Sequence, residues 1–348
     1  MILVDSSGND LGYRTLEHAP WNGMTLADLV FPSFLLIMGM STAISLGRHM
    51  DRGEPNAKLL RQALWRTLAI FSLGMLINLI LYSPSAGLRL PGVLQRISIC
   101  YFFCALVFMA DSFKLTALTA AALLLGYWLL MTCVPVPGFG RNVLSPEGNW
   151  ASYLDRRILG GHLYKPLFDP EGLLSTLPAL ATSLFGVMTG RWLRIHDRLA
   201  RKASVLLWAG LLAVALGWIW SRWFPLNKHL WTSSYALVAG GLSLWVFVLC
   251  YWLIDIFGLT AWTKPFVVFG INPLASYFLS GLFYGLQEFI KVPMPDGSPG
   301  NLKLRICASL FGSWLSPPNA ALAYAVSYVL VCVLFMSILH RKKLFLRV

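Results

Sequence analysis

The sequence predicts an all-α polytopic membrane protein with about nine transmembrane helices. Of its 348 residues, 57% are apolar and only 12% are charged, whereas a soluble domain carries about 25% charged residues. The mean hydropathy is +0.65, and the Leu-, Ala- and Val-rich runs approach the roughly 20 residues that a helical span needs. These runs do not alternate with polar residues as the strands of an outer-membrane barrel do. The lipid bilayer is therefore an expected partner.

Nine apolar segments, separated by charged or Pro- and Gly-rich linkers, predict the spans. They cover residues 26–46, 67–82, 93–110, 113–134, 174–193, 205–224, 234–256, 265–283 and 320–339. The first follows a polar loop and carries Pro32 in its first turns. The eighth is interrupted by Gly270, Asn272 and Pro273, which predicts a broken helix. We expect residues 1–348 to form a single transmembrane domain.

The polar segments between the spans predict three further elements. Residues 1–4 look like the end of a helix. They begin a segment, residues 1–24, that we expect to form an outer loop. Residues 135–174 are the longest polar segment, and their Trp and Tyr side chains favour a lid at the membrane interface. Residues 302–311 predict a short surface helix.

The charges predict the orientation. The linkers after spans one, three, five and seven, with the C-terminal tail, hold more than half of the 28 Lys and Arg but only a third of the 15 Asp and Glu. The positive-inside rule makes this side cytoplasmic, so the C-terminus lies inside and the loop that contains His18 lies outside. Because the net charge of +13 follows topology, it does not indicate nucleic-acid binding.

No pattern in the sequence predicts a metal or nucleotide-loop site. The six cysteines lie in apolar or amphipathic stretches without a C-x-x-C pair. Neither H-E-x-x-H, a P-loop nor G-x-G-x-x-G occurs.

Polar residues gather at the outer ends of the spans. His18, which can exchange a proton near neutral pH, runs into an apolar helix that carries Asp28. A carboxylate in a hydrocarbon span usually faces a cavity, a partner or a site. Gln95 and Arg96 lie just inside the third span, and snorkelling of Arg96 to the headgroups is the alternative. His229, like His162, is also external and competes with His18 for a catalytic role.

Five stretches carry a family resemblance. The stretch H-A-P-W-N-G-M-T-L-A-D-L-V-F-P-S-F from His18 resembles the loop-helix motif of the heparan-alpha-glucosaminide N-acetyltransferase family, including its bacterial members. The other stretches are similar to that family's further motifs in the same order: P-G-V-L-Q-R-I (91–97), D-P-E-G-L-L-S-T-L-P-A (169–179), N-K-H-L-W-T-S-S-Y (227–235) and G-I-N-P-L (270–274), followed by the tail R-K-K-L-F-L.

The resemblance implies a transmembrane acyltransferase in a bacterial inner membrane. An acetyl group would pass from cytoplasmic acetyl-coenzyme A to an amino sugar or glycan on the outer side, with His18 as general base or as acetylated intermediate. Residues 1–24 would then be the catalytic loop, in which Asp5 or Asp28 orients the imidazole. The expected substrate-binding residues are Trp21, Asn22, Gln95, Arg96, Asn227, Lys228, Trp231 and Ser234, and those for the coenzyme are Arg48, Arg61, Arg66 and Asn272. A homodimer is a possible assembly.

Two departures from the family pattern stand near His18. Similar members begin with a further helix, which we expect to be missing here. They also place Asn where this chain has Asp5, and an amide, unlike a carboxylate, donates a hydrogen bond. Two other functions remain open from the sequence: a transporter of amino sugars or glycan fragments, and an acyltransferase with a hydroxyl acceptor.

Overall fold

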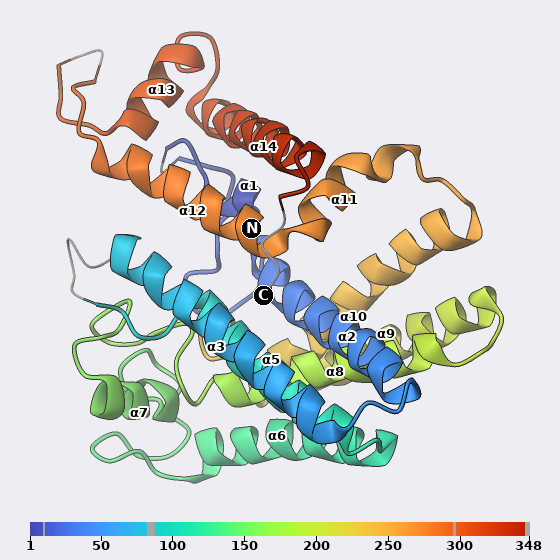
Figure 1. The fold of residues 1–348 in the computed structure, drawn as a ribbon. Helices are drawn as coiled ribbons and strands as arrows, with labels where there is room; N and C mark the ends of the chain where they lie inside the picture. Colours follow the sequence, from blue (N-terminus) through green and yellow to red (C-terminus); the bar gives the residue numbers. More distant parts are fainter. Residues whose placement is uncertain (10, 82–87, 295–296, 345–348) are drawn as a thin grey trace. The chain divides into compact units, whose positions relative to one another are not determined.

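The computed structural model describes residues 1–9, 11–81, 88–294 and 297–344, and this part of the chain is helical (Figure 1). The chain divides into two compact units, which we describe separately. Unit 1 contains Met1–His18, Thr25–Ala27 and Leu259–Val348. Unit 2 contains Ala19–Met24 and Asp28–Gly258.

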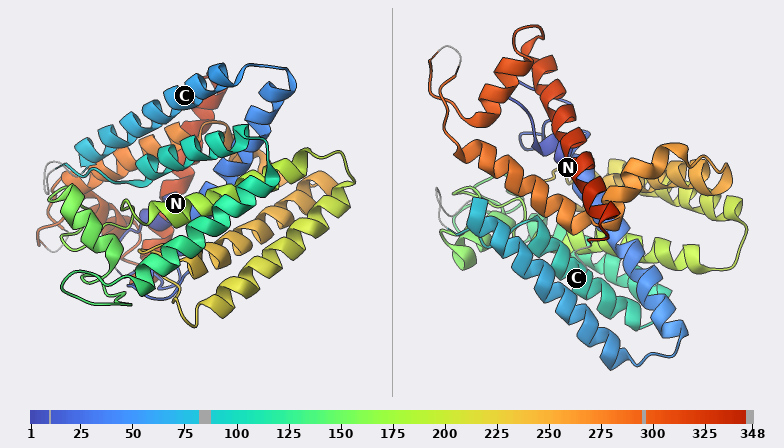
Figure 2. Two further views of the ribbon diagram at one scale, coloured as in Figure 1. Left: turned by 90° about the horizontal axis from the view of Figure 1, so that it is seen from below. Right: turned by 45° about the horizontal axis from the view of Figure 1, so that its top comes forward.

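Unit 2 holds most of the long helices. They are α2 (Val30–Asp51), α3 (Asn56–Leu81), α5 (Val93–Met109), α6 (Phe113–Cys133), α7 (Trp150–Leu159), α8 (Thr176–Arg194), α9 (Leu199–Trp220) and α10 (Ser233–Tyr251), with the single turns η1 (Ala27–Leu29) before α2 and η2 (Trp252–Ile256) after α10. Helix α8 packs against α2 and α6, α3 lies along α5, and α9 lies beside α10 (Figure 2). Residues 135–174, which the sequence predicts to form a lid, contain α7, whose N-terminus is capped by the side chain of Asn149.

Small residues set the contact between α2 and α8. A Cβ on Gly39 would collide with the carbonyl oxygen of Ser183, and a Cβ on Gly186 would collide with that of Leu36. The two backbones therefore touch, as in other membrane helix pairs with small residues at the interface. This contact holds α2, the helix that follows His18 and Asp28, firmly inside unit 2.

Unit 1 is built on α14 (Pro317–Arg341), with α11 (Lys264–Ile271), α12 (Pro273–Phe289), α13 (Leu302–Leu310) and the short α1 (Ile2–Asp5) and η3 (Ala261–Thr263). Helices α11 and α12 meet at an angle of 80°. Asn272 lies at this break, and Pro273 opens the second helix. Lys303 of α13 pairs with Glu288 of α12 at 2.5 Å. Burial opposes the charge of this ammonium, but the carboxylate outweighs burial and raises the pKa of Lys303.

The structure confirms an all-α polytopic membrane architecture. In the described ranges, six helices are long and apolar enough to cross a membrane, or seven if α11 and α12 form one broken span. Residues expected to form the third and fifth spans do form helices, α5 and α8. The count of nine spans and the single domain therefore stay predictions. The expected break near Asn272 and the helix near residues 302–311 are both present. Residue 82, at the end of the second expected span, and residues 345–348 of the tail lie outside the described residues.

Candidate functional site

A cavity of about 250 Å³ in unit 1 brings His18 and Asp5 together. Its walls come from the N-terminal segment, the loop before η1 and one face of α14. The lining residues are Leu3, Val4, Asp5, Ser7, Gly12, Tyr13, Leu16, Glu17, His18, Ala321, Leu322 and Ala325. An exposed imidazole and two exposed carboxylates therefore share one cavity. Such a set can bind a cation and move a proton.

Hydrogen bonds hold the loop that presents His18. The hydroxyl of Tyr13 donates to Asn319 of α14 at 2.5 Å. The Leu16 amide donates to the carbonyl of Tyr13, and the Thr25 hydroxyl donates to the backbone carbonyl of Glu17 at 2.7 Å. The loop is therefore fixed on both sides of the cavity residues.

Asp28 is fully buried in unit 2 and fixes the residue that follows His18. Its carboxylate accepts the Ala19 amide at 3.2 Å, and Lys228 lies 3.5 Å from the other oxygen. The Tyr235 hydroxyl donates to the Asp28 carbonyl at 2.5 Å. A buried carboxylate needs such partners to stay charged. This geometry suits a positioning residue.

The W-N-G and N-K-H-L-W motifs meet in unit 2, although about two hundred residues separate them. The Asn227 amide donates to the Asn22 side-chain oxygen at 3.1 Å, and the Gly23 amide donates to the carbonyl of Leu226. Trp21 donates from its indole to the carbonyl of Leu144. Four of the residues that the sequence predicts to bind substrate therefore lie in one neighbourhood: Trp21, Asn22, Asn227 and Lys228.

His229 packs against this group of residues. Its ring stacks on Trp21 with centroids 5.4 Å apart, and Phe168 packs edge-on at 5.3 Å. Its Nε2 lies 3.1 Å from the Ala19 carbonyl, so this nitrogen carries the proton. Burial lowers the pKa of His229, which favours the neutral ring. The ring therefore holds Ala19, and its competition with His18 for a catalytic role stays a prediction.

Trp231 and Arg96 are buried next to each other in unit 2. Trp231 has a left-handed backbone with φ of 49°, and its indole donates to Thr182 at 3.2 Å. A bulky residue in this region is strained, a feature that clusters at functional sites. The Arg96 guanidinium lies over the Trp231 ring at 5.3 Å. Its Nη2 donates to the Gly172 carbonyl and the Ser175 hydroxyl, whereas its buried Nε and Nη1 have no hydrogen-bond partner within the described residues.

Two other predicted substrate residues are engaged in packing. Gln95 points toward α3, where its side chain lies against Gly74 and its amide contacts the sulfur of Met75. Ser234 donates to the Phe224 carbonyl at 2.5 Å. A substrate contact by either residue stays a prediction.

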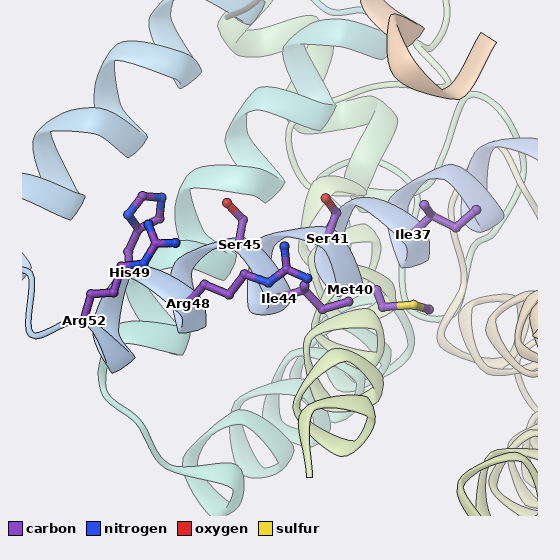
Figure 3. Close-up of a pocket in the computed structure, with 8 residues that line it drawn as sticks. All are labelled: Ile37, Met40, Ser41, Ile44, Ser45, Arg48, His49 and Arg52. Atoms are coloured by element: carbon purple, nitrogen blue, oxygen red, sulfur yellow. The ribbon is translucent and has the colours of Figure 1, made fainter. Parts of the chain in front are cut away.

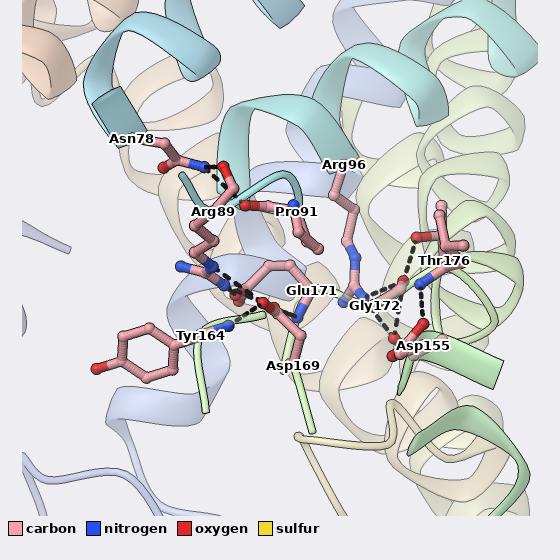
Figure 4. Close-up of polar contacts among 12 residues, drawn as sticks. Asn78, Arg89, Pro91, Arg96, Asp155, Tyr164, Asp169, Glu171, Gly172 and Thr176 are labelled. Carbon is pink, nitrogen blue, oxygen red and sulfur yellow. Dashed lines mark hydrogen bonds and ion pairs between the residues drawn. The ribbon is translucent and has the colours of Figure 1, made fainter. Parts of the chain in front are cut away.

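A buried ion cluster joins the α3–α5 connection to the D-P-E-G motif (Figure 4). Arg89 binds Asp169 through two contacts at 2.6 and 3.0 Å and Glu171 at 2.5 Å, and it lies over the ring of Tyr164. Burial opposes the charge of Glu171, but the nearby Arg89 and Arg96 outweigh burial and lower the pKa of Glu171. The cluster fixes the segment whose next residue, Gly172, accepts from Arg96.

Asp155 of α7 supports the same segment. Its carboxylate accepts the Leu173 amide at 2.8 Å, and a Cβ on Gly172 would overlap it. The side chain is buried. Burial raises the pKa of Asp155 to about 6, although the Leu173 amide lowers it.

We expect the Asp155→Asn variant to change how stability depends on pH. The pKa of Asp155 is about 6 in the folded chain and has the ordinary value of 3.8 in the unfolded chain. Between about pH 4 and pH 6, the folded chain therefore binds this proton more tightly than the unfolded chain does. The wild type therefore loses stability as pH rises from about 4 to about 6. The free energy of unfolding of the variant relative to wild type should rise across this window by up to roughly 3 kcal/mol. Unfolding in detergent measures it, with Asp111→Asn as an exposed control; a difference that is flat with pH would contradict the expectation.

A second cavity, of about 470 Å³, follows α2 (Figure 3). It is lined by Ile37, Met40, Ser41, Ile44, Ser45, Arg48, His49 and Arg52. Figure 3 shows the apolar and hydroxyl side chains along the helix and the basic ones at its C-terminal end. The other predicted coenzyme residues do not line it. Arg61 and Arg66 are exposed on α3, and Asn272 of unit 1 donates to the carbonyl of Leu344.

The comparisons with known proteins identify the family. The family model for the catalytic region of heparan-alpha-glucosaminide N-acetyltransferase matches residues 9–223. This chain belongs to that family. Two relatives named heparan-alpha-glucosaminide N-acetyltransferase, from Homo sapiens and Mus musculus, are 31% and 30% identical to it over 334 residues. Each alignment covers 80% of this chain and 50% of the relative, so the chain spans about half the length of these relatives.

Membership of this N-acetyltransferase family, with the apolar helices, makes the chain an integral membrane protein. The matched range contains His18, Asp28 and Arg96, whereas Asp5 and Asn227 lie outside it. In the part of the chain that is described, no group of three His, Cys, Asp or Glu side chains could hold a metal ion.

The sequence reasoning missed three residues at these sites: Glu17, Arg89 and Asp155. Glu17 stands beside His18 in the sequence, and that adjacency was the available signal. In the sequence, Arg89 follows a stretch that contains Ser and Pro, and Asp155 lies in a polar segment that also holds Arg156 and Arg157. Nothing local in these two stretches indicates burial.

Proposed function

We propose that this chain moves an acetyl group from acetyl-coenzyme A on the cytoplasmic side to the amine of an amino sugar or glycan on the outer side. The observation that carries the proposal is the unit 1 cavity, in which His18 lies with Asp5. Family membership supports the reaction class, because the relatives are named N-acetyltransferases. Their names also specify an amino-sugar acceptor, heparan-alpha-glucosaminide.

His18 can serve the reaction in two ways. As a general base, it takes a proton from the sugar ammonium. The nitrogen then bonds to the carbonyl carbon, the carbon–sulfur bond breaks, and the thiolate takes the second proton that the nitrogen releases. Alternatively, the imidazole nitrogen attacks the thioester first, the thiolate leaves, and the acetyl group then passes to the amine. In both routes Asp5 orients the imidazole and stabilises its charged form.

In unit 2, the part of the motif that follows His18 is held in place by two side chains. Asp28 fixes the Ala19 amide, and His229 fixes the Ala19 carbonyl, so the residue after His18 is held from both sides. Trp21, Asn22, Asn227 and Lys228 lie around this point. Within the described residues, Nε and Nη1 of Arg96 have no hydrogen-bond partner, and these donors suit a carbonyl or sugar oxygen.

The groove on α2 fits the donor. Its 470 Å³ lies within the roughly 300–1,000 Å³ of ligand pockets. Arg48 and Arg52 can bind phosphate oxygens through paired N–H donors. The apolar residues from Ile37 to Ile44 suit the less polar part of the coenzyme. The charge distribution of the linkers predicts that the basic end is cytoplasmic.

Vesicles with one protein orientation test the function. With acetyl-labelled acetyl-coenzyme A on the cytoplasmic face and glucosamine on the other, we expect labelled N-acetylglucosamine on the glucosamine side. The Arg48→Gln variant should raise the KM for acetyl-coenzyme A by about tenfold, because it removes a charge-assisted phosphate contact. Lys114→Gln, which removes an exposed lysine elsewhere, is the matched control.

One observation favours a second function, amino-sugar transport. The 80° bend between α11 and α12 resembles the broken helices at the sites of secondary transporters. Sugar uptake without acetyl-coenzyme A, and without N-acetylglucosamine, would support transport and overturn acetyl transfer. Acetylation of a hydroxyl acceptor in place of glucosamine would keep the acyltransferase reaction and overturn the amine acceptor.

A further inference from the structure

We propose that Glu17 selects the acceptor by charge, binding the ammonium group of an amino sugar so that an amine is held beside His18. This inference rests on the proposed acetyl transfer and adds a specificity-determining residue to it. It favours an amine acceptor over a neutral sugar that offers only hydroxyl groups.

The side chains of Glu17 and Ser7 both lie beside Gly12. A Cβ at Gly12 would lie 3.4 Å from Oε1 of Glu17 and 3.4 Å from Oγ of Ser7. All three residues line the cavity that contains His18. A carboxylate oxygen and a hydroxyl oxygen therefore lie beside the same glycine in this cavity. An ammonium group, which has three N–H donors, can bind both.

The backbone presents Glu17 rigidly. Its carbonyl oxygen accepts from the Thr25 hydroxyl at 2.7 Å, and the turn before it is closed by the Leu16 amide. The carboxylate is exposed, and within the described residues no hydrogen bond or ion pair engages it. The negative charge is thus accessible to a ligand, and the backbone that carries it is held in place, which reduces the ordering cost of binding.

The charge of the cavity contrasts with that of the chain. The protein carries a net charge of +13, yet the described residues that line this cavity include Asp5 and Glu17 and neither lysine nor arginine. A cleft lined by one sign of charge concentrates ligands of the opposite sign. The volume of about 250 Å³ is just under the usual range for ligand pockets, roughly 300–1,000 Å³. It therefore suits a single sugar ring with a positive charge.

Three variants test the role of Glu17. Glu17→Gln keeps the size and removes the charge, Glu17→Asp keeps the charge, and Glu147→Gln removes an exposed carboxylate from residues 135–174. We expect Glu17→Gln to raise the KM for glucosamine about tenfold, the loss of one charge-assisted hydrogen bond, with kcat within about twofold of wild type. Glu17→Asp should recover most of the affinity, and Glu147→Gln should behave as wild type.

Direct binding separates this inference from the proposed function. Calorimetric titration without acetyl-coenzyme A, at about pH 6 where a sugar amine is protonated, should show that wild type prefers glucosamine to glucose and that Glu17→Gln loses the preference. If wild type shows this preference but transfers no acetyl group, the proposed function fails and the role of Glu17 stands. If Glu17→Gln binds and acetylates glucosamine as wild type does, or if wild type binds glucose equally well, the role of Glu17 is overturned.

Discussion

Replacement of His18 by alanine is expected to lower the rate of acetyl transfer to glucosamine by about 10²–10⁴-fold, the usual contribution of a general base. The loss belongs in kcat, because the imidazole moves the proton or carries the acetyl group, whereas Glu17 binds the ammonium. The side chain is exposed at a cavity, so its removal leaves no buried void and the protein should fold normally. Initial rates in oriented vesicles measure the change in kcat, and thermal unfolding of the same preparations shows whether the variant is folded.

Two other histidines provide the comparison. His196→Ala removes an exposed imidazole from the linker between α8 and α9 and should leave the rate unchanged. His162→Ala removes a histidine whose Nδ1 lies 2.7 Å from the carbonyl of Leu88 and which does not line the cavity, so it should have a small effect. Transfer by His18→Ala at the wild-type rate would contradict the assignment. If the rate falls, steady-state patterns distinguish a ternary complex from ping-pong kinetics and so separate the two roles of His18.

The fold was largely predictable because its determinants are local. Apolar runs of membrane length predict helices whatever they pack against, and Asn272 followed by Pro273 predicts the break that separates α11 from α12. The grouping of helices into two units depends on side-chain contacts between distant segments. No local pattern encodes these contacts.

The sequence predicts individual residues of the site but not how they are arranged in space. His18 and Asp5 do share a cavity. Gln95 and Arg96, both expected to bind substrate, face different parts of unit 2: Gln95 lies against Gly74, and Arg96 donates to the Gly172 carbonyl. Consecutive residues of an α-helix, at 3.6 residues per turn, project about 100° apart, so adjacency in the sequence does not place them in one site. The pairing of Asn22 with Asn227 likewise depends on the tertiary fold.

Arg89 has no feature in the sequence that indicates burial, yet tertiary contacts bury it in an ion cluster. Its side chain is buried between Asp169 and Glu171. We expect Arg89→Met to destabilise the protein by about 3–5 kcal/mol, the cost of leaving a buried ion cluster without one partner. The variant should also lose activity, since the segment from Asp169 to Gly172 carries the carbonyl that accepts from Arg96. The free energy of unfolding in detergent and the acetyl-transfer rate are the measurements.

A matched control and a second substitution isolate the cause. Arg201→Met removes an exposed arginine paired with Asp197 and should cost no more than about 1 kcal/mol. Adding Glu171→Gln to Arg89→Met should recover part of the stability, because it removes one of the unpaired charges. Equal costs for Arg89→Met and Arg201→Met, or full additivity in the double variant, would show that the cluster is not coupled.

The pH dependence of Arg89→Met should oppose that of the wild type. In the wild type the lowered pKa of Glu171 makes its contribution to stability complete above the unfolded-state pKa and lost as pH falls through the folded-state value. Without Arg89, burial is less opposed and the pKa of Glu171 should rise above its ordinary 4.5. Protonation then removes the unpaired charge, so the cost of Arg89→Met should shrink as pH falls from 7 toward about 5. A cost that is constant across this range would mean that lost packing over Tyr164, and not buried charge, accounts for the destabilisation.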